Sequence, residues 1–89
     1  MKAIMSVVGA DRVGIVADVS ALLAKKGVNI LDITQTIMDD IFTMTILVDI
    51  SKSEYSFDDI SAALSELGDA LSLSIRIQRR EVFTAMHRI

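Results

Sequence analysis

Two glycines near the start of the chain flank a short polar segment, Gly9-Ala10-Asp11-Arg12-Val13-Gly14. The segment, here called the 9–14 loop, joins an apolar run to a helix-periodic run, which predicts a strand that turns into a helix. The first amide groups of a helix have no partner within it, and the helix dipole favours a negative group there. Glycine carries no Cβ, so a ligand can approach the backbone closely. The loop therefore predicts an anion-binding corner.

The residues after the loop argue against nucleotide phosphate as the anion. A Walker loop needs Lys and then Ser or Thr after its second glycine, whereas Gly14 is followed by Ile15 and Val16. The spacing of dinucleotide-binding glycines is also absent. The amides of Val13 and Gly14 could instead take a carboxylate while Asp11 takes an ammonium, and these are the two charged ends of an amino acid. Asp11 also fits an N-cap or turn residue, a role that is compatible with ligand binding.

Other polar residues add one candidate and exclude several. Asn29 opens the second predicted strand and offers both a donor and an acceptor, so we expect it near the same rim as the loop; a turn or capping role is the alternative. His87 is the single histidine and has no second His, Cys or tight carboxylate cluster beside it. The sequence therefore predicts no catalytic residue, no metal site and no cofactor.

Composition bounds the protein class. The chain has 89 residues, 52% of them hydrophobic, no cysteine and a net charge of -3. This size predicts one domain over 1–80 with a tail over 81–89, and a chain this short gains from a partner subunit. The absence of cysteine is typical of a cytoplasmic protein. No apolar run is long enough to span a membrane. The negative net charge disfavours nucleic acid as a partner.

Hydrophobic periodicity predicts the elements that position these residues. Strands are expected over 2–8, 28–38, 42–50 and 71–78, and helices over 14–26 and from Ser56 to a stop near Gly68. Apolar residues of the tail share one helical face, which predicts a short C-terminal helix packed on the domain or on the partner. These are Val82, Phe83, Met86 and Ile89.

The order β-α-β-β-α-β predicts an α+β, ferredoxin-like fold: a four-stranded antiparallel sheet with two helices on one face. Strands one and three should be central. Strand two is then an edge, and it carries neither Lys nor Pro, the usual protection against pairing with another chain. We therefore expect a two-fold homodimer through the edge of strand two and the first helix.

The 9–14 loop with Ile15 and Val16, the helix behind it, and Gly27-Val28-Asn29-Ile30 together resemble the ACT domain over residues 2 to 80. The tail from Arg80 to Ile89 resembles that of free-standing ACT proteins similar to the glycine cleavage system regulator, a family without an established function. One departure is that many ACT loops have Pro where this chain has Val13. Proline would hold that loop more rigidly.

This resemblance implies a non-enzymatic regulatory domain that binds a small amino acid at a dimer interface. The implied ligand residues lie in the loop and at the start of the second strand, the latter contributed by the partner subunit. They are Asp11, Arg12, Val13, Gly14, Ile15, Asn29 and Ile30.

Two other functions stay open at this point. A protein-interaction module would use the dimer and the basic tail and leave the corner empty. An acylphosphatase-like hydrolase would use Arg12 to hold phosphate, although no residue stands out to position water. An RNA-binding sheet is disfavoured because the predicted polar face offers Thr43, Thr45 and Ser74 where stacking aromatics should lie.

Overall fold

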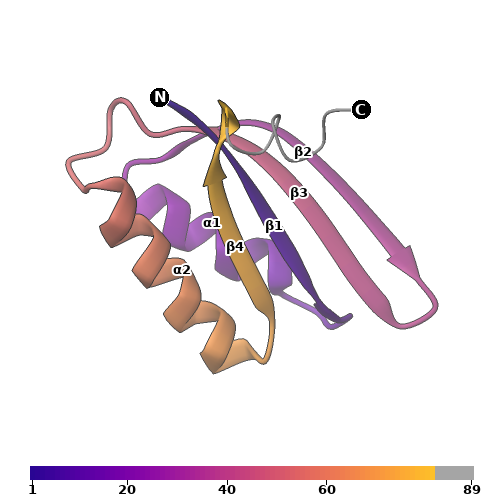
Figure 1. Ribbon diagram of the computed structural model, residues 1–89. Helices are drawn as coiled ribbons and strands as arrows, with labels where there is room; N and C mark the ends of the chain where they lie inside the picture. The colour runs from indigo at the N-terminus through magenta and orange to yellow at the C-terminus, as the bar shows by residue number, and fades with distance from the viewer. Residues whose placement is uncertain (82–89) are drawn as a thin grey trace.

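The computed structural model describes residues 1–81. Six elements follow one another along the chain (Figure 1). They are β1 (Lys2–Ala10), α1 (Ile15–Lys25), β2 (Asn29–Met38), β3 (Ile41–Asp49), α2 (Phe57–Leu71) and β4 (Ser74–Arg79). The tail helix predicted over 81–89, with His87, lies outside the described residues from 82 onward. No helix within 1–81 has the length and apolar character needed to cross a membrane.

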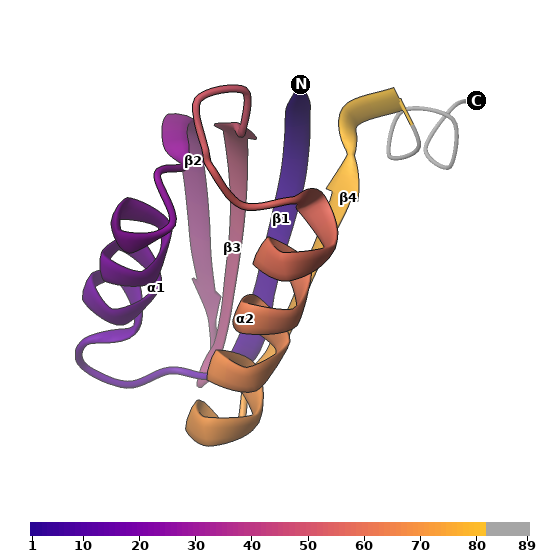
Figure 2. The ribbon, with the colours of Figure 1, turned by 90° about the vertical axis from the view of Figure 1, so that its left-hand side faces the viewer.

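The sheet has the order β2-β3-β1-β4, and all of its pairs are antiparallel. Both helices lie on one face, and the other face carries no helix of the described chain (Figure 2). The ferredoxin-like fold, the central positions of β1 and β3 and the edge position of β2 are confirmed. Two ends of the sheet matter below: the hairpin end, where Ala10 pairs with Ile41, and the N-terminal end, where Lys2 pairs with Asp49.

The core forms between the sheet and the two helices. Alternate residues of β1 and β3 point into it, and in β3 this matches the alternation of apolar and polar residues in the sequence. Each helix contributes a stripe of aliphatic residues at helical spacing. The largest fully buried side chains are Met5, Val7, Ile15, Val19, Leu23, Met44, Ile46, Val48, Ile60 and Leu64.

Helix α2 begins as predicted but ends later. The Ser56 hydroxyl accepts a hydrogen bond from the Asp59 amide at 3.1 Å, which confirms the N-cap. The predicted stop at Gly68 is wrong, because the helix continues to Leu71 and β4 starts only at Ser74. Gly68 is buried instead, and a Cβ there would stand 2.7 Å from the Leu73 carbonyl oxygen. The glycine therefore serves close packing between the helix and the start of β4, not helix termination.

Strand β2 lies at the edge and is exposed along nearly all of its length. A register shift between Ile30 and Asp32 makes Leu31 an extra residue, so only the residues beyond it keep the predicted alternation. Ile33 pairs with the buried Ile46 and Ile37 with the buried Phe42, which places both isoleucines on the helix-bearing face of the sheet. Their side chains are nevertheless 38% and 57% exposed, so the described chain covers this margin of the sheet only in part.

Candidate ligand-binding corner

The 9–14 loop lies at the hairpin end of the sheet. The Asp11 amide donates a hydrogen bond to the Asp40 carbonyl oxygen at 2.8 Å, which ties the loop to the β2–β3 turn. That turn is tight, and Asp39 adopts a positive φ of 60° within it. The corner is therefore built from two loops that are remote in sequence, a feature that the sequence pattern alone does not reveal.

The start of α1 confirms one prediction and corrects another. Gly14 is the N-cap, with a φ of 95° that favours glycine, and its carbonyl accepts the Asp18 amide at 2.9 Å. The N-cap role predicted for Asp11 is wrong, because no side chain of the described residues caps this helix. The other amides of the first turn therefore have no capping oxygen, and the helix start can accept an anion.

Arg12 folds back over this helix start. One guanidinium nitrogen donates to the Val13 carbonyl at 3.1 Å, and the other lies 3.3 Å from the Asp18 carboxylate. Both charged side chains of this ion pair are exposed, so water screens it and its contribution to stability is about 1 kcal/mol or less. Arg12 thus places a cation beside the corner, paired with Asp18.

The apolar residues of the 9–14 loop and the helix start differ sharply in solvent exposure. Val13 is 96% exposed, so its side chain is free to contact a ligand or a partner. Ile15 is 1% exposed and belongs to the core. Ile15 can therefore serve a ligand only through its backbone.

Asn29 and Ile30 lie at the other end of the molecule. Asn29 pairs with Asp49 at the N-terminal end of the sheet, whereas the loop lies at the hairpin end. Helix α1 runs between the two, and its length is about 16 Å at 1.5 Å per residue. The expectation that one chain places Asn29 on the same rim as the loop is therefore wrong.

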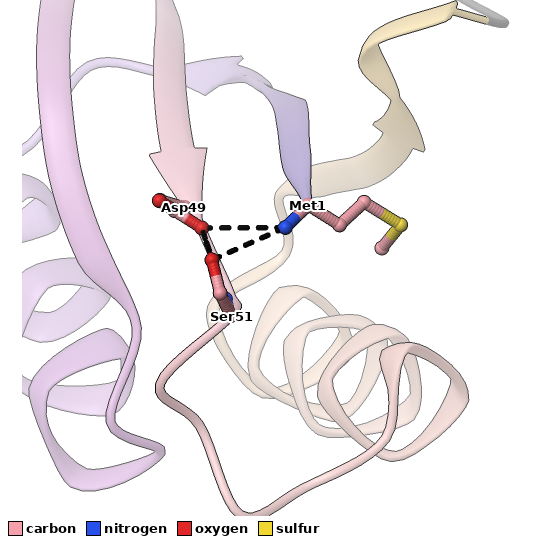
Figure 3. A network of polar contacts seen from close by, with 3 residues as sticks. All are labelled: Met1, Asp49 and Ser51. Atoms are coloured by element: carbon pink, nitrogen blue, oxygen red, sulfur yellow. Dashed lines mark hydrogen bonds and ion pairs between the residues drawn. The ribbon is translucent and has the colours of Figure 1, made fainter.

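Met1, Asp49 and Ser51 form a network of polar contacts at the N-terminal end of the sheet, here called the clasp (Figure 3). The Asp49 carboxylate accepts hydrogen bonds from the Ser51 hydroxyl and, at 2.9 Å, from the Ser51 amide, and the Met1 ammonium lies 3.5 Å away. These contacts favour the ionised carboxylate, with those from Ser51 the largest, and lower the pKa of Asp49 from 3.8 to about 2. The clasp holds the first residue of the chain against the end of β3.

Two surface hollows also lie away from the loop. One of about 370 Å³ lies between the start of α2 and the end of β4, and it includes the Phe57 ring with the Arg79 guanidinium 5.5 Å from its centre. The other, of about 250 Å³, lies at the end of α1. Among residues 1–81, no group of three His, Cys, Asp or Glu side chains is arranged to hold a metal ion.

A sequence model of the ACT domain matches residues 2–78. The chain is an ACT domain. A UPF0237 protein of Clostridium acetobutylicum is 51% identical to it over the whole length of both chains. An ACT domain protein from Streptococcus pneumoniae has a solved structure that superposes with a TM-score of 0.82 at 42% identity, covering 93% of each chain.

A more distant structural neighbour carries a regulatory name. It is a protein described as a glycine cleavage system transcriptional repressor, with a TM-score of 0.74 at 25% identity. The match covers 86% of this ACT domain but 44% of that chain. The resemblance to the ACT domain expected from the sequence is confirmed, and the regulatory association belongs to the neighbour.

The sequence predictions for this ACT domain missed the residues around the hollow at the end of α1. Lys25 and Lys26 lie at the end of α1, where the helix dipole alone explains lysines, and Lys52 and Tyr55 lie in the loop between β3 and α2. Their separation along the chain hid the cluster. The predicted topology could have indicated it, because the end of the first helix and the loop after strand three both lie at the N-terminal end of a sheet with this order.

Proposed function

We propose that this protein is a homodimeric, non-enzymatic regulatory ACT domain that binds a small amino acid at the 9–14 loop. The observation that carries the proposal is the edge of β2, a ten-residue strand whose Ile33 and Ile37 side chains are covered only in part by the described chain. An edge of this kind pairs readily with another chain. A second copy supplies the same strand and the same partly covered apolar surface.

Residue types along β2 favour one pairing register. In a two-fold antiparallel pair centred on Gln35, Ile33 lies opposite Ile37 of the partner subunit, and the same contact recurs on the other side of the axis. Thr34 lies opposite Thr36 of the partner subunit. Asp32, the one charged residue of the strand, then faces a methionine and not its own copy. Apolar pairs and matched threonines stabilise a sheet, whereas directly opposed like charges would destabilise it.

The same pairing explains why the predicted site residues are far apart in one chain. Antiparallel strands place the start of one beside the end of the other, so Asn29 of the partner subunit comes to the hairpin end. The Asp11 amide is bonded to the hairpin turn at that end. The two halves of the corner, separated in one chain, are thus adjacent in the proposed dimer, and this arrangement supports an interfacial ligand site.

The chemistry of the corner suits both ends of an amino acid. The amides at Val13, Gly14 and the start of α1 suit the carboxylate. The Asp11 carboxylate suits the ammonium, and Asn29 of the partner subunit supplies a further donor and acceptor. A ligand that contacts both subunits favours the dimer, so ligand occupancy would be transmitted as a change in assembly.

The hydrolase alternative loses support from the position of Arg12. Its guanidinium is already engaged by the Val13 carbonyl and the Asp18 carboxylate, so it does not stand alone as a phosphate ligand. A cytoplasmic setting fits the cysteine-free sequence.

Calorimetric titration with a panel of amino acids tests the ligand. We expect saturable binding to the wild-type protein and at least about tenfold weaker binding to Gly14→Asp, because a carboxylate beside the helix start repels that of the ligand. Ser65→Asp is the matched control, because it adds the same charge at an exposed position on α2, away from both the loop and Asn29. An absence of saturable binding to any amino acid would contradict the ligand part. If the dimer persists without a ligand, the protein-interaction alternative gains support.

A further inference from the structure

The hollow of about 250 Å³ lies between the C-terminal end of α1 and the loop that joins β3 to α2. These two segments are far apart in sequence and lie side by side at the upper left of Figure 1. This surface, here called the lysine hollow, is on the N-terminal end of the sheet, away from the 9–14 loop. Its lining residues are Lys25, Lys26, Gly27, Lys52, Glu54 and Tyr55.

The charge of the lysine hollow is opposite to that of the protein. Three of the four lysines of the chain line it, against a single acidic residue, Glu54, although the net charge of the chain is -3. Within residues 1–81, none of these three ammonium groups has a carboxylate within 4.0 Å, and the ion pairs of this part of the chain involve Met1 and Arg12 instead. No ion pair within the described residues therefore compensates these three ammonium groups.

Hydrogen bonds hold the two walls of the hollow together. The Ser53 hydroxyl donates to the carbonyl oxygen of Lys26, and the Tyr55 amide donates to the Ser53 hydroxyl oxygen at 3.1 Å. The Lys26 ammonium lies 4.1 Å from the centre of the Tyr55 ring, a cation–π contact that links the walls a second time. The lysines are therefore brought together by a defined local structure and not only by composition.

A purely structural explanation covers part of this cluster. Lysines in the last turn of a helix interact favourably with its dipole, which accounts for Lys25 and Lys26. It does not account for Lys52, which comes from another segment and lines the same hollow. Tyr55, with 42% of its surface exposed, is likewise not needed for the core.

We propose that the lysine hollow binds a small phosphate-bearing metabolite. Three positive side chains and one negative leave an excess of two positive charges, which matches the charge of about -1.5 to -2 on a phosphate monoester near neutral pH. Lysine ammonium groups bind phosphate as point charges and do not need the planar geometry that arginine offers. The hollow can also hold a small organic group beside the Tyr55 ring.

Amide chemical shifts of the full chain test the proposal. The probes are inorganic phosphate, ribose 5-phosphate and ribose, each added at constant ionic strength. We expect saturable shifts around Lys25 to Gly27 and at Tyr55 with both phosphates and none with ribose. Ribose 5-phosphate should bind more tightly than inorganic phosphate if the organic group also contacts the hollow, whereas equal affinities would identify free phosphate as the ligand.

Two single-charge variants separate a site from general attraction. Lys52→Gln removes one cation from the hollow and should weaken binding by about fivefold or more, since it changes both charge and a direct contact. Lys2→Gln removes the same charge on β1, outside the hollow, and should leave the affinity nearly unchanged. Equal weakening by both variants, or shifts that sodium chloride reproduces, would overturn the proposal. These titrations contain no amino acid, so their outcome does not depend on whether the 9–14 loop binds one.

Discussion

The two edges of the sheet differ in how far their helices are capped and their apolar side chains buried. At the β4 edge, α2 is capped by Ser56 and packs closely through Gly68, and the short strand buries Ile75 and Ile77. At the β2 edge, α1 begins without a capping side chain, and a longer strand leaves its isoleucines partly exposed. Each of these edge strands has one side without a neighbouring strand in the sheet, but only the β2 side also has an uncapped helix start and partly exposed isoleucines. The uncapped helix start and the partly exposed isoleucines lie on the same side of the domain, which is the side that the proposed dimer would use.

The largest expected effect comes from charging the β2 edge. Ile33→Lys with Ile37→Lys places like charges directly opposite one another in the proposed register, and such contacts cost several kcal/mol. We expect the dimer to dissociate with a Kd raised about 100-fold or more, while the monomer keeps its fold because both side chains are already partly exposed. Analytical ultracentrifugation measures the dissociation, and circular dichroism checks the fold.

A matched variant adds the same two charges elsewhere. Ser65→Lys with Ser74→Lys alters exposed positions on α2 and β4 and should leave the dimer unchanged. If this variant dissociates the dimer and the β2 variant does not, the two edges have been assigned the wrong roles.

The second effect tests the close packing of the other half. Gly68→Ala places a Cβ 2.7 Å from the Leu73 carbonyl oxygen, which is backbone and cannot move without shifting β4. We expect a loss of about 1 to 3 kcal/mol of unfolding free energy, measured by urea denaturation. Gly9→Ala meets the end of the Leu73 side chain, which can rotate away, so its cost should be smaller. Equal losses of unfolding free energy for Gly68→Ala and Gly9→Ala would contradict a special role for the close contact between Gly68 and the Leu73 backbone.

The third effect concerns the N-cap of α2, a side-chain cap of the kind that α1 does not have. Ser56→Ala removes the hydroxyl that accepts the Asp59 amide and should cost about 1 kcal/mol. Ser65→Ala, at an exposed position within the same helix, removes no cap and should be neutral or slightly stabilising, because alanine favours helices. Chemical denaturation of the two variants gives the comparison, and a cost for Ser65→Ala that matched Ser56→Ala would contradict the capping role.

The smallest effect lies in the clasp at the N-terminal end. Because the pKa of Asp49 is lowered in the folded state, its contribution to stability is present above its ordinary pKa of 3.8 and is lost as the pH falls towards 2. Ser51→Ala removes the hydroxyl that contributes most, so the pKa of Asp49 should rise and the loss of stability between pH 4 and pH 2 should shrink. Carboxyl chemical shifts measure the pKa, with Ser51→Thr as the control that keeps a hydroxyl. An unchanged pKa in Ser51→Ala would show that Ser51 does not hold the carboxylate.

Sequence reasoning predicted the fold well because its evidence was local and periodic. Alternation in β3 and the stripe in α1 fixed which faces are buried, and the Ser56 cap marked the start of α2. It misjudged Gly68, because a glycine needed for a tertiary contact looks the same in sequence as one that ends a helix. Propensity cannot tell these cases apart without knowing what packs against the helix.

The candidate site was harder to predict, for a geometric reason. Asn29 was expected on the same rim as the loop, but the two segments adjoin opposite ends of α1 and so lie at opposite ends of the domain. The loop residues themselves were located correctly at the start of α1, although only the structure shows Arg12 paired with Asp18. Residues on either side of a helix are therefore poor candidates for one pocket in one chain, and better candidates for a pocket shared by two.

The strand order also bears on how the chain folds as it is synthesised. β1 emerges from the ribosome first, yet it occupies a central position and must wait for β4, the last strand, to cover its outer side. The β2–β3 hairpin closes over a two-residue turn and forms early, whereas the β1–β4 contact closes a loop that spans most of the described chain. A nascent chain thus exposes the edge of β1 until residues 74–79 emerge, after which β4 forms the edge on that side of the sheet. Truncation before β4 would therefore leave a sheet prone to aggregation.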